Sequence, residues 1–336
     1  MGKLIEEGAS LINTKNIANI RKQIKLKKGA DFLYSIFRLV FLISVGFIII
    51  YPLFYMLVSS VKSNDEILYS TRIWIPEGFS VLNNYKIATI CLDYAKSLWS
   101  TFLNELIPAM IQVVSCSVVA YGFARFEFKF KNAMMFLLIV TILVPDMILL
   151  IPRMVNYSNV DFLGILGIVN KITGVDLRIN ILNSVWAFWL PSLLAVGLKS
   201  GILIYIYIQF FKGLPYELEE AAWVDGAGPI RTFVSIALPL SGEVIVTVTI
   251  FSLVWHWNDT TLSQMYISSD YPLAVLLERI DIQLFTKQGL LMGVKNPESI
   301  SYVMASCMLF VLPMLLVYMV LQRRFIESID RIGITG

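Results

Sequence analysis

Apolar segments about 20 residues long recur along the chain, and they restrict its fold more than any other feature of the sequence. The clearest are residues 39–61 and 300–321, neither of which contains a charged residue. A helix of about 20 apolar residues crosses the hydrocarbon core of a bilayer. Hydrophobic residues make up 57% of the 336-residue chain and charged residues 15%, too few to cover a soluble globule of this size. We therefore predict an all-α membrane protein.

The hydropathy pattern predicts six transmembrane helices, with approximate bounds at 39–61, 98–124, 133–152, 191–211, 244–262 and 300–321. An even number of spans places both termini on one side of the membrane. Basic residues cluster before the first span, between Arg21 and Arg38, and in the short connections 125–131 and 322–331. Because positive charge in short loops favours the cytoplasmic side, both termini are predicted to be cytoplasmic.

This pattern divides the chain into three parts. Residues 1–37 are predicted to be a basic cytoplasmic arm or an interfacial helix, because apolar and basic residues alternate irregularly there. Residues 38–325 are the predicted transmembrane domain, which includes a cytoplasmic loop at 212–241. Residues 326–336 are the predicted cytoplasmic tail.

The chain contains few residues suited to catalysis or metal binding. His256 is the only histidine, and the three cysteines, Cys91, Cys116 and Cys307, lie far apart in the sequence. No phosphate-binding Gly-x-x-x-x-Gly-Lys-Ser/Thr loop occurs. We predict no catalytic residue, no metal site and no cofactor bound by this chain. The net charge of +3 is attributed to membrane orientation, and nucleic acid is not an expected partner.

The cytoplasmic loop contains two short helical patterns separated by a turn. Pro215 suits the first turn of the first helix, and the acidic residues Glu217, Glu219 and Glu220 lie where a helix dipole favours them. The stretch Asp225-Gly226-Ala227-Gly228-Pro229 then predicts a break. The second helix is expected to present Ile230, Phe233, Val234 and Ala237 on one face and to end at Pro239. Small side chains at Ala221, Ala222 and Gly226 would allow another surface to approach closely.

The spacing of residues in this loop resembles the EAA motif of ABC importer permeases. The matching positions are Glu220, Ala221, Ala222, Gly226, Ile236, Leu238 and Pro239, and Asp225 precedes the glycine of the predicted bend. The resemblance implies that the loop forms the coupling helices that dock on an ATPase subunit. Stretches at 120–126, 257–259 and 321–325 are similar to the carbohydrate-uptake, MalG-like branch of this family.

The resemblance implies a subunit that is not itself an enzyme and that moves a sugar or oligosaccharide inward by alternating access. The implied partners are a second, homologous permease in a heterodimer, two ABC ATPase subunits, an extracytoplasmic solute-binding protein and membrane lipid. ATP and Mg²⁺ would be used by the ATPase subunits. The implied location is the bacterial or archaeal cytoplasmic membrane.

Polar residues inside or near the predicted spans are candidates for the substrate pathway. Lys199 in the fourth span is one candidate, with Asp146 in the third span as a possible partner, because an intramembrane charge needs water or an opposite charge. Trp257, Asn258 and Asp259 follow at the outer end of the fifth span, where aromatic residues also serve as interface anchors. Glu105 could cap the second span or face a cavity.

Two alternatives remain open at this point. An ABC permease for a non-sugar solute would share the same loop. An ion-coupled secondary transporter would explain Glu105, Asp146 and Lys199 inside the spans but would leave the loop motif unexplained.

Overall fold

The computed structural model describes residues 2–161, 164–174, 178–289 and 299–334. Within these ranges the regular elements are helical, and the only β-type pairing is an isolated antiparallel bridge between Val160 and Ile179. The chain divides into two units, Met1–Val58 and Ser59–Gly336.

The first unit is formed by α1 (Gly2–Val61), a continuous helix whose last residues belong to the second unit. Its segment Asp31–Val61 is long and apolar enough to cross a membrane. The helix runs without interruption through residues 37 and 38, where the sequence predicted a boundary between the basic arm and the first span.

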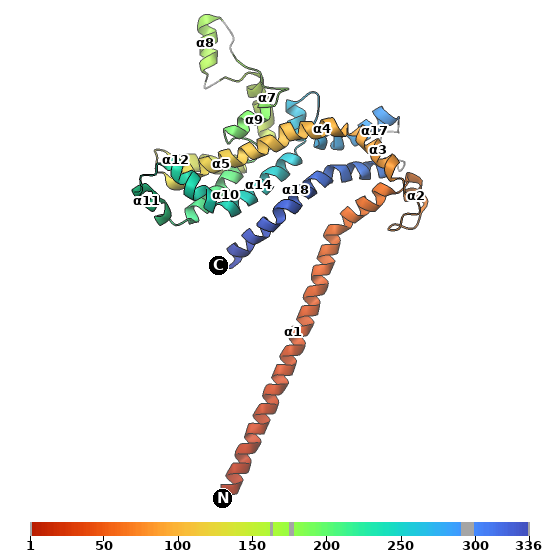
Figure 1. Cartoon of the computed structure of the whole chain (residues 1–336), viewed down its shortest axis with the longest axis vertical. Coiled ribbons are helices and arrows are strands. Elements are labelled where there is room, and N and C mark those ends of the chain that lie inside the picture. The colour runs from red at the N-terminus through yellow and green to blue at the C-terminus, as the bar shows by residue number, and fades with distance from the viewer. Residues whose placement is uncertain (1, 162–163, 175–177, 290–298, 335–336) are drawn as a thin grey trace. The chain divides into compact units, whose positions relative to one another are not determined.

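A second long apolar segment, Tyr94–Arg125, lies at the centre of the second unit (Figure 1). It consists of α4 (Tyr94–Thr101), the π-helical turn η1 (Phe102–Leu106) and α5 (Ile107–Arg125). The helices α9 (Trp186–Leu193), α10 (Ser200–Gly213) and α14 (Gly242–Trp257) pack against α5. Their shared core includes the fully buried side chains of Tyr207, Phe211 and Val248.

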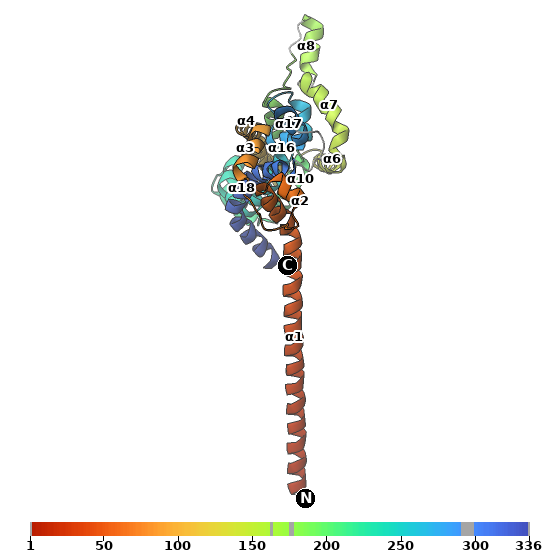
Figure 2. The same cartoon turned by 90° about the vertical axis from the view of Figure 1, so that its right-hand side faces the viewer.

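The third predicted span is sharply bent. Its two helices, α6 (Lys131–Leu143) and α7 (Asp146–Ser158), meet at an angle of 106° (Figure 2). Pro145 lacks a backbone N–H and disfavours a helical conformation at Val144, whose backbone is extended. The expected straight helix therefore ends before Asp146, which begins the next one.

The fourth predicted span is also interrupted, because α9 ends at Leu193 and α10 begins at Ser200. Ala195 and Lys199 adopt positive φ angles of 58° and 53°, which are incompatible with a right-handed helix. A continuous fourth helix across 191–211 was therefore a wrong prediction. The fifth segment is bent by 82° between residues 229–240 and α14, and α14 ends at Trp257 rather than Leu262.

The described residues contain three helices able to cross a membrane, or up to five if each bent pair counts as one span. The third is Ile300–Gln322 within α18 (Ile300–Ile334), which packs on α3 (Val81–Cys91) and α14. Other short helices are α2 (Asn64–Tyr69), α8 (Ile165–Thr173), α15 (Thr261–Tyr266), α16 (Leu273–Glu278) and α17 (Ile280–Gln288).

Candidate functional site

The loop between α10 and α14 folds as a helical hairpin, which we define as residues 214–240. Its first limb is α11 (Glu217–Val224), and its second combines α12 (Pro229–Thr232), η2 (Phe233–Ala237) and α13 (Leu238–Leu240). At the bend, the N–H of Ala227 donates to Ala222 O at 2.9 Å and the N–H of Gly226 donates to Trp223 O at 3.0 Å. This pair of bonds is a Schellman motif, and Gly226 takes the left-handed conformation it requires, with φ of 83°.

The tip of the hairpin exposes apolar side chains. Val224 is 88% exposed and Ile230 81% exposed on the two sides of the bend. The second limb does not present one continuous apolar face as predicted, because Phe233 and Ala237 pack into the bundle core whereas Ile230 and Val234 remain exposed. The hairpin is therefore attached to the bundle along one side and has an open apolar tip.

A buried ion pair attaches the hairpin to α5. Arg125, the last residue of α5, donates from Nε to Glu219 Oε1 at 2.8 Å, and their side chains are 5% and 1% exposed. Tyr121 Oη donates to Glu219 Oε2 at 2.9 Å, and Arg125 Nη2 donates to Leu214 O at 3.0 Å. The ring of Tyr121 also lies 4.9 Å from that of Phe233 on the second limb. The end of α5 thus contacts both limbs of the hairpin.

Sequence reasoning missed this joint. It selected Glu220, which is exposed, whereas the adjacent Glu219 is the buried partner of Arg125. The sequence did contain a signal for this ion pair. Arg125 is a basic residue at the end of an apolar helix, and the short helix α11 contains three acidic residues that could pair with it.

The other motif residues take several positions on the hairpin. Ala221, Asp225 and Gly226 are exposed near the bend, and Ala222 is half-buried. Ile236 and Leu238 are half-buried on the second limb, and Pro239 is exposed. Pro239 does not end this limb as predicted, since it lies at the start of α13, where its missing N–H is tolerated.

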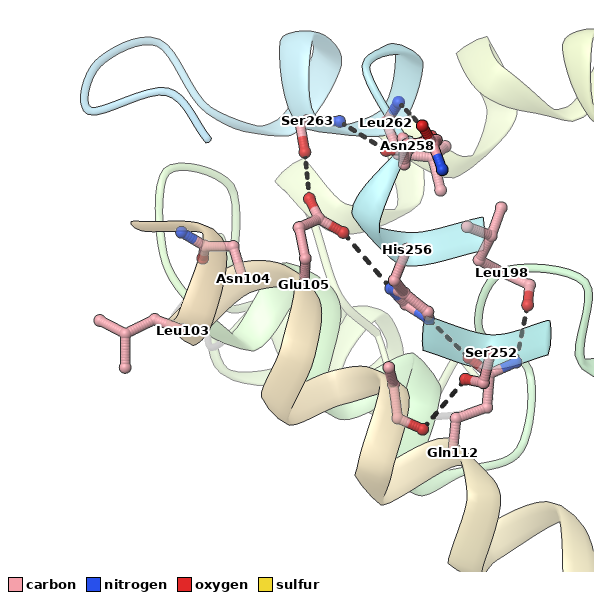
Figure 3. A network of polar contacts seen from close by, with 12 residues as sticks. Leu103, Asn104, Glu105, Gln112, Leu198, Ser252, His256, Asn258, Leu262 and Ser263 are labelled. Atoms are coloured by element: carbon pink, nitrogen blue, oxygen red, sulfur yellow. Dashed lines mark hydrogen bonds and ion pairs between the residues drawn. The ribbon is translucent and has the colours of Figure 1, made fainter. Parts of the chain in front are cut away.

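A second candidate site is a buried chain of hydrogen bonds inside the bundle (Figure 3). Glu105 Oε1 accepts from Ser263 Oγ at 2.5 Å, and Glu105 Oε2 lies 3.3 Å from His256 Nδ1. His256 Nε2 lies 2.8 Å from Gln112 Oε1. Gln112 Nε2 donates to Leu198 O at 2.6 Å and to Ser200 Oγ at 2.9 Å. The network joins η1, α5, α14 and α15 to the break between α9 and α10.

The donors and acceptors in this network can be assigned by starting from Leu198 O. Leu198 O can only accept, so the amide nitrogen of Gln112 faces it and the amide oxygen faces His256. His256 must then donate from Nε2. A hydrogen bond between Nδ1 and Glu105 therefore requires one shared proton, on the imidazole or on the carboxyl group.

A cavity beside this network is lined by Glu105, His256, Arg153, Asp259 and Tyr266, among others. Its volume is about 20 Å³, enough for a single water molecule. Small-molecule sites typically measure about 300–1,000 Å³. The cavity in this conformation therefore accommodates no sugar. Within the described ranges, no group of three or more His, Cys, Asp or Glu side chains is arranged to hold a metal ion.

Lys199 and Asp146 do not pair with each other. Asp146 Oδ1 lies 3.5 Å from Arg153 Nη2 on the same helix. Lys199 is exposed, and its Nζ lies 4.9 Å from the ring centroid of Trp255 in α14. The suggested Lys199–Asp146 pair is not formed, because Arg153 is the ion-pair partner of Asp146 and the ammonium of Lys199 lies over Trp255 instead.

The three residues after His256 have separate roles. Trp257 is 3% exposed and lies 5.5 Å from Phe310, ring to ring, so it belongs to the core rather than to an interface belt. Asn258 is exposed and donates to Val254 O at 2.8 Å. Asp259 accepts from the backbone N–H of Leu262 and of Ser263, and so caps α15.

Comparison with protein families gives a match over residues 114–331, which includes the hairpin. The matching family is described as "Binding-protein-dependent transport system inner membrane component". The polygalacturonan/rhamnogalacturonan transport system permease protein YtcP of Bacillus subtilis is 28% identical over 293 residues, covering 86% of this chain and 93% of that protein. The probable starch degradation products transport system permease protein AmyC of Thermoanaerobacterium thermosulfurigenes is 25% identical, covering 83% and 89%.

The fold is also similar to that of a solved structure. A chain of a bacterial ABC transporter involved in the import of the acidic polysaccharide alginate superimposes with a TM-score of 0.63. The match covers 88% of this chain and 98% of that chain, at 17% sequence identity.

Proposed function

Because this chain belongs to the family of binding-protein-dependent transport system inner membrane components, we propose that it is the permease subunit of an ATP-driven importer for a sugar or oligosaccharide. The chain is a transport subunit and not an enzyme. The observation that carries the proposal is the hairpin 214–240, whose tip is exposed and apolar while its root is joined to α5 by the buried Arg125–Glu219 pair.

The hairpin has the properties of a docking element for an ATPase. Val224 and Ile230 offer apolar surface, and Ala221 and Gly226 allow close approach of a partner backbone. A displacement of α11 is passed through Glu219 and Arg125 to α5, which packs against α9, α10 and α14. The ATPase subunits would bind ATP and Mg²⁺, and this chain would bind neither.

The proposed assembly contains a second, homologous permease, two ATPase subunits and an extracytoplasmic solute-binding protein, embedded in the lipid of a bacterial or archaeal cytoplasmic membrane. In it this chain crosses the membrane six times with both termini in the cytoplasm. The fourth crossing is the interrupted pair α9 and α10, and the broken segments resemble the discontinuous helices found where transporters line a pathway.

A carbohydrate substrate is supported by the names of two relatives, which describe transport of polygalacturonan/rhamnogalacturonan and of starch degradation products. The hairpin favours an ATP-driven importer over an ion-coupled transporter, which has no use for an ATPase docking element. Among the candidate pathway residues, Lys199 and Asn258 are exposed and are proposed to face the solute. Trp257 supports the pathway from the core, while Asp146 and Asp259 hold Arg153 and α15 in place.

The docking role is tested with Val224→Asp and Ile230→Asp in the full importer. A charge at either exposed position opposes apolar contact, so we expect copurification of the ATPase subunits to fall at least tenfold and ATP-dependent uptake to be lost. Ile172→Asp is the matched control, because Ile172 is 78% exposed on α8, outside the hairpin. Full ATPase recovery with both hairpin variants, or uptake that follows an ion gradient without ATP, would refute the proposed function.

A further inference from the structure

We propose that Lys199, together with Trp255 and Phe251, forms a binding site for the carboxylate of an acidic saccharide on the translocation pathway. This inference rests on the proposed function and narrows it from carbohydrates in general to saccharides that carry uronic acids. The structural basis is an exposed ammonium group held over an aromatic surface, with no carboxylate among the described residues paired with it.

The site lies deep in the membrane in the proposed topology. Lys199 immediately precedes the 14-residue helix α10, whose other end leads into the hairpin. Trp255 is the fourteenth residue of α14, counted from the hairpin side. At 1.5 Å per residue, both residues lie about 20 Å from the cytoplasmic ends of their helices, within a hydrocarbon core about 30 Å thick. A lysine at this depth faces a wet cavity, pairs with an anion or a backbone carbonyl, or extends to the membrane interface.

No such anion comes from the described part of this chain. None of the ion pairs there includes Lys199, and Asp146, the nearest candidate by sequence reasoning, pairs with Arg153. Among the described residues, the ammonium lies over the face of Trp255, with 4.9 Å from Nζ to the ring centroid. A cation–π contact leaves the other N–H donors of the lysine free for an oxygen ligand.

The buried network fixes the backbone that carries this lysine. Gln112 Nε2 donates to Leu198 O (Figure 3). It also donates to Ser200 Oγ, so its two acceptors precede and follow Lys199 in the sequence. The same amide binds His256, the neighbour of Trp255, through Oε1. One side chain therefore contacts residues adjacent to the lysine and to the tryptophan. Binding sites need this kind of support, because a group held in place loses less entropy when a ligand arrives.

The aromatic residues supply the surface for the sugar ring. Phe251 and Trp255 are one helical turn apart on α14, with ring centroids 5.5 Å apart and planes 19° apart. Phe251 is 41% exposed and Trp255 is half-buried. The C–H face of a pyranose can rest on these rings while its carboxylate meets the Lys199 ammonium. A neutral sugar can stack on the rings but has no carboxylate to pair with the ammonium.

The test is equilibrium binding of radiolabelled digalacturonate and of galactobiose, its uncharged counterpart, to the full importer in nanodiscs without the solute-binding protein. We expect the acidic disaccharide to bind at least tenfold more tightly. Lys199→Met is expected to abolish this preference and Lys199→Arg to retain it. Both replacements are unbranched, which suits the positive φ at this position. Lys212→Met, at the other end of α10, is the matched control and should keep the preference.

Equal binding of the two disaccharides, absence of digalacturonate binding, or a preference that survives in Lys199→Met would overturn the site. The last result would mean that a group other than Lys199 recognises the carboxylate. Lys199→Gln serves as a second neutral variant if Lys199→Met fails to copurify with its partners. The solute-binding protein is then added to a separate portion of each preparation and the ATP hydrolysis that it stimulates is measured. Stimulated hydrolysis shows that the importer works even where the acidic-saccharide site is wrong.

Discussion

At the scale of single residues, Gly226 determines the shape of the hairpin tip. Its φ of 83° is unfavourable for residues with a Cβ, although a Cβ at this position would meet no atom within 4 Å. Gly226→Ala should therefore destabilise the bend by about 1 kcal/mol. Asparagine tolerates this conformation better, so Gly226→Asn should preserve the bend while adding bulk at the tip.

The two substitutions separate backbone strain from close approach of the ATPase. If the ATPase backbone contacts Gly226, both variants should reduce ATPase copurification, and Gly226→Asn should reduce it at least as much as Gly226→Ala. Normal copurification and uptake with Gly226→Asn would show that only the backbone conformation matters. Copurification and ATP-dependent uptake are the two measurements.

Gln112 is the second residue with a large predicted effect. Gln112→Leu removes the acceptor of His256 Nε2 and the donor to Leu198 O and Ser200 Oγ, leaving buried polar groups without partners. Each unsatisfied group costs about 1–3 kcal/mol, so the thermal midpoint of the purified protein should fall clearly. Met110→Leu on the exposed face of the same helix should leave the midpoint within about a degree, since such volume-conserving changes cost little. Equal midpoints for the two variants would contradict the role assigned to the network.

At the scale of secondary-structure elements, the joint between α5 and α11 is the route by which hairpin motion reaches the bundle. Breaking one side of a buried ion pair costs about 3–5 kcal/mol, because the remaining charge is left unpaired. Arg125→Ala and Glu219→Ala should therefore reduce uptake strongly, while ATP hydrolysis by the docked ATPases continues. The double exchange Arg125→Glu with Glu219→Arg should recover only part of the uptake. The ion pair can form again, but the bond from Arg125 to Leu214 O is lost.

The control for this joint is the neighbouring pair Lys131–Glu127. Its N–O distance is also 2.8 Å, but the Glu127 side chain is 89% exposed, so Glu127→Gln should change stability by no more than about 1 kcal/mol. A joint that only stabilises the fold would lower uptake and ATP hydrolysis in parallel. Loss of uptake with preserved hydrolysis is the result that supports coupling.

At the scale of the whole molecule, the number of crossings depends on the interrupted segment. If α9 and α10 together make one crossing, the chain crosses six times and both termini lie in the cytoplasm. If they do not, the number is five and the termini lie on opposite sides. For six crossings, a fluorescent protein fused to the C-terminus should fluoresce, because that end lies in the cytoplasm. Alkaline phosphatase inserted at Asn180 should be active, because that loop lies outside. Phosphatase activity at the C-terminus would contradict six crossings.

Much of the architecture and the position of the hairpin followed from local properties of the sequence. Apolar length identifies segments able to enter a bilayer, and the spacing from Glu220 to Pro239 placed the chain in a family that the comparison confirmed. Helix breaks were harder to predict. Pro145 is a local signal for the bend after α6, but the positive φ angles at Ala195 and Lys199 depend on contacts with distant side chains such as Gln112.

The sequence by itself thus determined the membrane environment, the hairpin and the bend at Gly226, because hydropathy, spacing and turn preference are properties of neighbouring residues. Only the tertiary structure decided which charges are paired. Glu219 meets Arg125 across 94 positions of the chain, and Glu105 meets His256 across 151. These pairings depend on how helices pack in three dimensions. The same packing leaves Lys199 over Trp255 without a carboxylate partner in the described residues.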